Sequence, residues 1–194
     1  MIAPGDEFRL ITGSGYRDRP VDELRPVTLT PEWRDEFISM AAEFQDAGDP
    51  VYDKPAAHFD EFLVQIANES HALELPPDHV PMGWYWLALG ERLIGASRFR
   101  RRQTSALLAV DGHIGYEIRP SERGKGFATY LLSMMLDVAR DFGRERVLLT
   151  CTADNKASLR VIEKNGGERF GSSVAPATGV IHHQYWISLT GSLL

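Results

Sequence analysis

The stretch RPSERGKGFATY, residues 119–130, joins two glycines and two cationic side chains to the start of an apolar, helix-like run. Gly124 and Gly126 lack the Cβ atoms that would keep an anion away from the backbone. Arg123 offers a forked hydrogen-bond donor, and Lys125 offers a point charge. A helix N-terminus also leaves about four amides without an intrahelical acceptor. This combination predicts a site for a phosphate or pyrophosphate.

Two other phosphate-binding motifs do not fit the stretch. The loop of nucleoside-triphosphate-binding proteins requires G-x-x-x-x-G-K-[ST], whereas Lys125 lies between two glycines. The dinucleotide fingerprint requires G-x-G-x-x-G, and Thr129 stands where its third glycine should be. What remains is a strand, a loop of exposed amides and a helix, with the Thr129 hydroxyl as a further contact. A solvated turn without a ligand is the alternative for an isolated G-x-G.

Hydrophobic spacing predicts the elements that position this loop. A strand over residues 113–119 precedes it, and a helix over residues 126–142 follows it, because apolar residues there recur every three or four positions. Upstream, the pattern predicts a strand near residue 24, helices over about 31–44 and 54–71, and the hairpin GWYWLAL–LIGASRFR. Downstream, it predicts the buried strand RVLLTC, a helix over 155–164 and the strand VIHHQYWISL. This order predicts a mixed α/β domain over residues 22–194 behind an arm of residues 1–21.

Composition and charge restrict the class of protein. The chain has 194 residues, 43% of them hydrophobic and 25% charged, which fits one globular domain, as a monomer or homodimer. Its formal net charge of −6 gives no overall positive field for nucleic acid or an anionic membrane. No run reaches the ~18 apolar residues of a membrane span, so we expect a cytoplasmic protein. The lone Cys151 is interpreted as a core residue, and no cysteine pair or histidine spacing suggests a metal.

Two motifs at a characteristic separation resemble a known family. Arg123-x-x-Gly126-x-Ala128 matches the [QR]-x-x-G-x-[GA] signature of the GNAT superfamily of N-acetyltransferases, and NKASLRVIEKNGGE is similar to their next conserved block. Together the motifs cover about residues 112–170, and the whole most resembles a bacterial branch of predicted acetyltransferases of unassigned substrate. The resemblance implies a GNAT acyl-CoA N-acyltransferase fold. In that fold a twisted, mostly antiparallel sheet with a splayed parallel pair is flanked by about four helices.

The resemblance also implies a cofactor site for acetyl-CoA, without a metal. The main chain around Tyr116 and Ile118 would pair with the pantetheine arm, and the side chain of Asn155, with Ser158 nearby, would contact the cofactor. A helix N-cap role would explain Asn155 equally well. The pyrophosphate would bind the loop amides of Arg123, Gly124, Lys125, Gly126, Phe127, Ala128 and Thr129.

The implied reaction is direct acetyl transfer from acetyl-CoA to an amine of unknown identity. An amine arrives as ammonium, with a reference pKa near ~10.4 if it resembles lysine, so a base must remove its proton. Glu117 is the first candidate base and His113 the second, and strand alternation puts both on one face. The alternatives are an outward-facing polar Glu117 and a structural His113.

A departure from the family concerns the general acid. Many members place a tyrosine two residues before the Lys of the E-K-x-G block, and here that residue is Ile162. Tyr116, Tyr185 or a water would then have to protonate the departing thiolate. A CoA-binding module without turnover is therefore an alternative, as is an acyltransferase for another acyl group or an oxygen acceptor.

Four arginines, Arg98, Arg100, Arg101 and Arg102, lie at the end of the predicted hairpin. The favoured interpretation is a solvated strand end. The alternatives are contacts with the 3′-phosphate of the cofactor, with an anionic acceptor or with nucleic acid.

Overall fold

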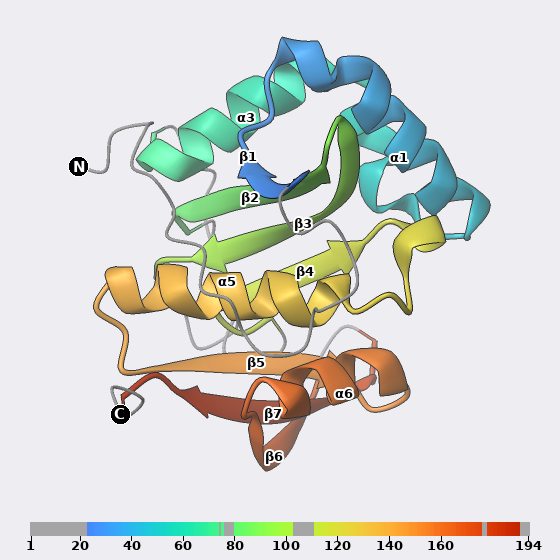
Figure 1. Cartoon of the computed structure of the whole chain (residues 1–194). Coiled ribbons are helices and arrows are strands. Elements are labelled where there is room, and N and C mark those ends of the chain that lie inside the picture. The colour runs from blue at the N-terminus through green and yellow to red at the C-terminus, as the bar shows by residue number, and fades with distance from the viewer. Residues whose placement is uncertain (1–22, 74, 76–79, 103–110, 176–177, 191–194) are drawn as a thin grey trace.

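The computed structural model describes residues 23–73, 75, 80–102, 111–175 and 178–190, so the arm predicted for residues 1–21 lies outside the described residues. Two antiparallel sheets form the centre of the molecule (Figure 1). The first has the strand order β1 (Leu24–Val27), β2 (Met82–Leu89), β3 (Arg92–Arg100) and β4 (Ile114–Ile118). The second has the order β5 (Arg146–Thr152), β7 (Ile181–Ser188) and β6 (Glu168–Val174).

The described residues form five α-helices, one more than the approximate number expected. They are α1 (Arg34–Asp46), α2 (Asp53–Ala57), α3 (Phe59–His71), α5 (Phe127–Asp141) and α6 (Lys156–Lys164). The extra helix arises because His58, with φ −132° and ψ 55°, interrupts the single helix predicted over 54–71. The mixed α/β prediction is confirmed.

Each face of the first sheet packs against different helices. Helices α1 and α3 cover one face, where Phe37, Phe62 and Trp86 belong to one buried cluster. Helix α5 covers the opposite face, and its apolar stripe, including Leu131 and Leu132, is fully buried as the helical spacing predicts. The sheet therefore separates a helix α1/α3 face from a helix α5 face.

Strands β4 and β5 form the junction between the two sheets. They run in the same direction, because α5 carries the chain back across the sheet between them (Figure 1). At the start of β4, His113 N donates to Leu148 O at 2.7 Å. Beyond that bond the strands separate, since β4 ends one sheet and β5 begins the other. The predicted splayed parallel pair is present.

Candidate active site

The loop between β4 and α5 presents backbone donors at the start of a 15-residue helix. Gly124 and Gly126 have φ values of +74° and +88°, a backbone region that glycine adopts readily. Within the described residues, the amides of Gly124, Lys125, Gly126 and Ala128 donate to no protein acceptor. Such a row of unpaired amides at a helix N-terminus fits an anion. We call residues 123–129 the anion cradle.

The two cations of the cradle, Arg123 and Lys125, already contact other groups of the protein, which the sequence did not indicate. The guanidinium of Arg123 lies 5.5 Å from the ring centroid of Phe44, and its Nε donates to Ile118 O at 3.0 Å. Lys125 Nζ pairs with Glu122 Oε2 at 2.9 Å. The amides of Arg123 and Thr129 are also used, since they donate to Pro120 O and Gly126 O. The cradle is therefore made chiefly of backbone.

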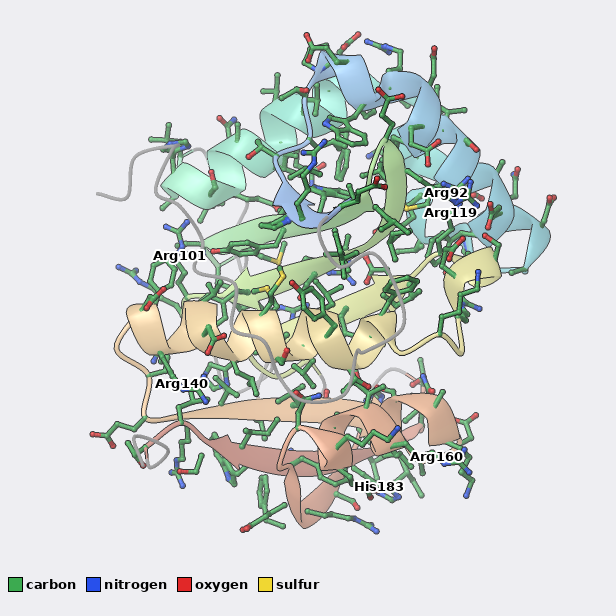
Figure 2. The ribbon with its side chains drawn as sticks, viewed as in Figure 1. Arg92, Arg101, Arg119, Arg140, Arg160 and His183 are labelled. Carbon is green, nitrogen blue, oxygen red and sulfur yellow. The ribbon has the colours of Figure 1, made fainter. Side chains whose placement is uncertain are left out.

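A buried arginine anchors the turn that leads into the cradle. Arg119, at the end of β4, is 1% exposed and lies with Arg92 between the sheet and α1 (Figure 2). It pairs with Glu36, and its Nε donates to Glu43 Oε1 at 2.7 Å. The other oxygen of Glu43 accepts from Ser121 N at 3.1 Å, in the turn before the cradle. Helix α1 thus fixes the position of the cradle.

Within the described residues, the edge of β4 that faces the gap has no strand partner along Tyr116 and Ile118, although Ile118 O accepts from Arg123 Nε. Arg119 N donates to Ile94 O in β3, so the alternation of an antiparallel pair turns the amides and carbonyls of Tyr116 and Ile118 toward β5. An extended amide chain placed in the gap could pair with this edge. The cavity there has a volume of about 250 Å³ and is lined by Arg98, Arg100, Asp111, Ile114, Gly115, Tyr116, Thr150, Cys151, Thr152, Asn155, Ser158 and His182.

Polar groups on the α6 side of this cavity are hydrogen-bonded to one another. The hydroxyl of Tyr116 lies 2.8 Å from Ser158 Oγ, and Asn155 Oδ1 accepts from Ser158 N at 3.0 Å, which confirms the N-cap geometry of Asn155. Burial raises the pKa of Tyr116 and of Cys151, so both groups hold their protons at neutral pH. The protonated hydroxyl of Tyr116 thus belongs to a residue that lines the cavity, whereas Tyr185 does not line it.

Glu117 lies on the opposite face of β4, toward α1 and α3. Its side chain is 12% exposed, so it is not an outward-facing polar residue. It accepts a hydrogen bond from the Tyr52 hydroxyl and pairs with Arg98, whose guanidinium lies 5.1 Å from the ring centroid of Trp84. Burial raises the pKa of Glu117, and the charge of Arg98 opposes that rise. Sequence reasoning missed Tyr52, because 65 positions separate it from Glu117.

Comparison with known proteins identifies the family of this chain. Residues 23–168 match the family model described as "Acetyltransferase (GNAT) domain". The chain belongs to the GNAT acetyltransferases. No curated protein matches it.

Solved acetyltransferases share the fold of this GNAT domain. It is similar to the microcin C7 self immunity acetyltransferase MccE in complex with acetyl-CoA and AMP, at 15% identity and TM-score 0.66, with 86% of this chain and 93% of that chain covered. It is also similar to Mycobacterium smegmatis RimJ in complex with CoA-disulfide, at 17% identity and TM-score 0.66, with 85% and 81% covered. RimL, a ribosomal L7/L12 alpha-N-protein acetyltransferase in complex with coenzyme A, gives 15% identity and TM-score 0.65, with 86% and 94% covered.

The described residues of the GNAT domain contain neither a membrane-spanning helix nor a group of metal ligands. None of their helices has the length and apolar character needed to cross a membrane. None of their His, Cys, Asp and Glu side chains gather in a group of three that could hold a metal ion.

The side chain of His113 is buried in this GNAT domain and is hydrogen-bonded to the backbone of β5. It is 6% exposed, and its Nδ1 accepts from Leu148 N at 2.9 Å, where β4 and β5 begin to separate. Burial, followed by the charge of Arg144, lowers the pKa of His113 to about 4. The imidazole is therefore neutral at pH 7 and uses one nitrogen to join the strands, which favours the structural alternative over the base.

We expect His113→Asn to remove an acid-sensitive component of stability. Because the native pKa lies below the unfolded value of ~6.5, protons favour the unfolded chain, and stability falls as pH drops from about 6.5 to 4. Asparagine keeps an acceptor without titrating, whereas His113→Ala should cost about 1–3 kcal/mol at pH 7 by leaving Leu148 N unpaired. Urea unfolding of the three proteins between pH 7 and 4 measures this. Equal pH dependence of His113→Asn and the parent protein would refute it.

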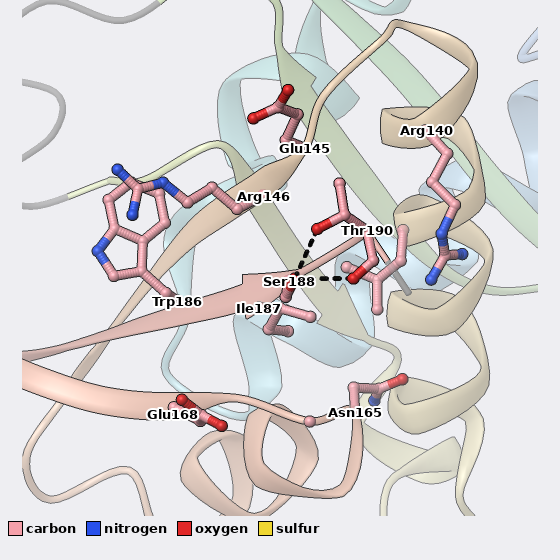
Figure 3. A pocket seen from close by; sticks show the side chains of 11 residues that line it. Arg140, Glu145, Arg146, Asn165, Glu168, Trp186, Ile187, Ser188 and Thr190 are labelled. Atoms are coloured by element: carbon pink, nitrogen blue, oxygen red, sulfur yellow. Dashed lines mark hydrogen bonds between the residues drawn. The ribbon is translucent and has the colours of Figure 1, made fainter. Parts of the chain in front are cut away.

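A larger hollow of about 760 Å³ lies at the other end of β5 (Figure 3). Its cations already have partners: Arg140 pairs with Asp137, and Arg146 lies 4.2 Å from the ring centroid of Trp186. Ser188 Oγ lies 3.2 Å from Thr190 Oγ1. None of the residues that line this hollow belongs to the cradle or to β4, so the candidate active site is the smaller cavity.

Proposed function

We propose that the protein transfers an acetyl group from acetyl-CoA to an amine by direct attack within one ternary complex. The observation that carries this proposal is the alignment of the anion cradle, the β4 backbone edge and the cavity along one strand–loop–helix unit. The unpaired amides fit a pyrophosphate, and the gap-facing edge of β4 fits an amide-bearing arm. Bound acetyl-CoA would supply the acetyl group as a thioester. The structures of MccE, RimJ and RimL with CoA ligands support this assignment.

The two faces of β4 suggest separate roles for its side chains. Tyr116 reaches the α6 side of the cavity with its proton retained, so we assign it the donation of a hydrogen bond or proton to the leaving sulfur. Glu117 lies on the α1/α3 face, where we place the acceptor, and we assign it the removal of the amine proton, directly or through water. Many family members have a tyrosine as general acid where α6 has Ile162. A tyrosine in the cavity could take that role, which favours turnover over binding alone.

Charge and composition restrict the acceptor and the setting. The net charge of −6 argues against a nucleic-acid or membrane partner and accords with the expected cytoplasmic location. Both a monomer and a homodimer remain compatible with the proposal.

Release of free thiol from acetyl-CoA, measured across a broad panel of amines, tests the transfer. Turnover with amines supports the proposal, and turnover with alcohols alone would indicate an oxygen acceptor. Tight CoA binding without any turnover on the panel would instead support the binding module.

We expect Glu117→Gln to lower kcat by about 10²–10⁴-fold above the pKa of Glu117, where the parent carboxylate is ionised, and by less below it, where Glu117 is itself protonated. In the parent protein the rate should fall as pH drops through the raised pKa of Glu117. Tyr52→Phe is the matched control, because it keeps the carboxyl and removes a hydrogen bond that lowers the Glu117 pKa. It should move the acidic limb of the pH–rate profile to higher pH. Identical profiles for Glu117→Gln and the parent protein would exclude Glu117 as the base.

A further inference from the structure

The cavity contains an arginine pair that the proposed transfer does not use. Arg98 and Arg100 lie two residues apart in β3, so both side chains project from the same face, beside Gly115 of β4. Their side chains are 22% and 14% exposed, so the solvated strand end expected from the sequence is wrong for these two residues. Arg102, in the same run, is exposed as expected.

Gly115 leaves a small space between the two guanidinium groups. A Cβ atom at this position would lie 3.6 Å from Arg98 Nε and 3.7 Å from both Arg98 Nη2 and Arg100 Nη1. Because Gly115 has no side chain, three guanidinium nitrogens from the two arginines approach the same side of its backbone. We call this space the Gly115 niche.

The donors around the Gly115 niche are incompletely paired. Arg98 Nη2 donates to Glu117, but within the described residues Arg98 Nε is buried and has no hydrogen-bond partner. Arg100 has two long contacts with Asp111: Nη1 donates to Asp111 O at 3.4 Å, and Nη2 lies 3.6 Å from Oδ1 of a side chain that is 45% exposed. Burial, the largest effect, lowers the pKa of Arg100. An oxyanion in the niche would supply the acceptor that these buried donors lack.

The niche lies beside the proposed base on the acceptor face. Gly115 and Glu117 are two residues apart on one strand, a separation of roughly 6.6 Å along β4. The face is opposite the one that packs on α5, so the cradle and the niche cannot bind the same phosphate group. The niche lies on one side of the cavity of about 250 Å³, whose other side is the gap that we assign to the cofactor arm.

We infer that the acceptor is a small amine that also carries an anionic group, most simply a carboxylate, and that Arg98 and Arg100 hold this group in the Gly115 niche. The inference rests on the proposed function. A polyamine or another purely cationic amine would place positive charge against the two guanidinium groups and would be a poor acceptor.

The test compares matched acceptors at saturating acetyl-CoA. Amino acids, β-alanine and γ-aminobutyrate are each paired with the corresponding amide, and phosphoethanolamine is paired with ethanolamine. In every pair of which at least one member is acetylated, the parent protein should show a kcat/KM at least about tenfold higher for the anionic member. A preference for the phosphate member would define the anion as phosphate within the same niche. Equal kcat/KM values within every pair would overturn the inference.

Two variants test the niche itself. Gly115→Ala has room, because 3.6 Å is an ordinary contact distance and the backbone is not left-handed, yet its methyl group fills the niche. Arg100→Gln removes a donor that makes no hydrogen bond to Glu117; because the charge of Arg100 lowers the pKa of Glu117, the variant is compared at a pH above the acidic limb of both pH–rate profiles. Both should reduce the anionic preference about tenfold or more, whereas Arg102→Gln, an exposed arginine of the same run, should retain it. An equal loss of kcat for anionic and neutral members would assign Arg100 to the reaction centre and overturn the inference.

Calorimetric binding measurements distinguish a failure of this inference from a failure of the proposed acetyl transfer. The CoA-loaded protein should bind β-alanine or another anionic amine more tightly than the matched amide, whether or not turnover occurs. Binding of the amide with equal or greater affinity would overturn the inference. Failure of CoA itself to bind would instead contradict the proposed function.

Discussion

Replacing Arg119 by methionine is expected to destabilise the protein by about 3–5 kcal/mol, because it leaves two partly buried carboxylates without their shared cation. Arg119 is 1% exposed and also donates to Ser39 Oγ at 2.8 Å and Leu93 O at 3.3 Å. Burial alone would raise the pKa of Glu43, but hydrogen bonds from Ser121 and Arg119 lower it to about 2. Denaturant unfolding at pH 7 measures the loss. The same variant should weaken CoA binding, since Glu43 also holds the turn before the cradle.

Arg92→Met is the matched control for this prediction. Arg92 also pairs with Glu43, at 3.2 Å, but its side chain is 43% exposed, so its loss should cost less than about 1 kcal/mol. Adding Glu43→Gln to Arg119→Met should recover part of the stability by removing one unpaired carboxylate. In the parent protein the stabilisation from Glu43 is present above pH ~4.5 and is lost as pH falls toward 2, and Arg119→Met should retain only the part that the hydrogen bonds from Ser121 supply. Equal destabilisation by Arg119→Met and Arg92→Met would contradict the buried network.

Gly126→Val is expected to raise the Kd for CoA by about 100-fold or more, because it displaces backbone donors of the cradle and adds a branched side chain there. The substitution also has a structural cost. Gly126 has φ +88°, where a residue with a Cβ costs about 1–2 kcal/mol, so some loss of stability is expected as well. Calorimetric titration with CoA, together with thermal unfolding, measures both effects.

Gly143→Val separates the two effects of the Gly126 substitution. Gly143 follows the C-terminus of the same helix, has φ +70°, and has open space where a Cβ atom would lie. It should show a similar loss of stability with unchanged CoA affinity. If Gly126→Val kept the CoA affinity of the parent protein, the cofactor assignment of the cradle would be withdrawn.

Local sequence explains why most elements could be predicted. The helical spacing of apolar residues such as Leu131 and Met135 places α5, and both residues are fully buried. Strand β5 was equally predictable from its continuous apolar run. Strand β6 was not located, because its residues are mostly exposed and GSSV carries no apolar alternation. The break at His58 was missed because the apolar spacing continues on both sides of it.

The cradle could be predicted from the sequence, whereas the contacts of Arg119 and Arg123 could not. Unpaired amides at Gly124 and Gly126 follow from the glycines and from the start of a helix, which are local properties. That Arg123 lies against Phe44, and that Arg119 joins α1 to the turn, depends on contacts across about 80 positions of sequence. No short-range pattern encodes such contacts.

The sequence by itself determined the family, most of the helices and strands and the anion cradle, because helix periodicity, glycine and helix-terminal amides act within a few residues. Only the tertiary structure decided what surrounds Glu117. The partners of Glu117 come from residues 52 and 98, and the Gly115 niche exists because antiparallel pairing sets two arginines of β3 against a glycine of β4. Strand register brings those donors to the same side of Gly115, and register is a property of the folded sheet.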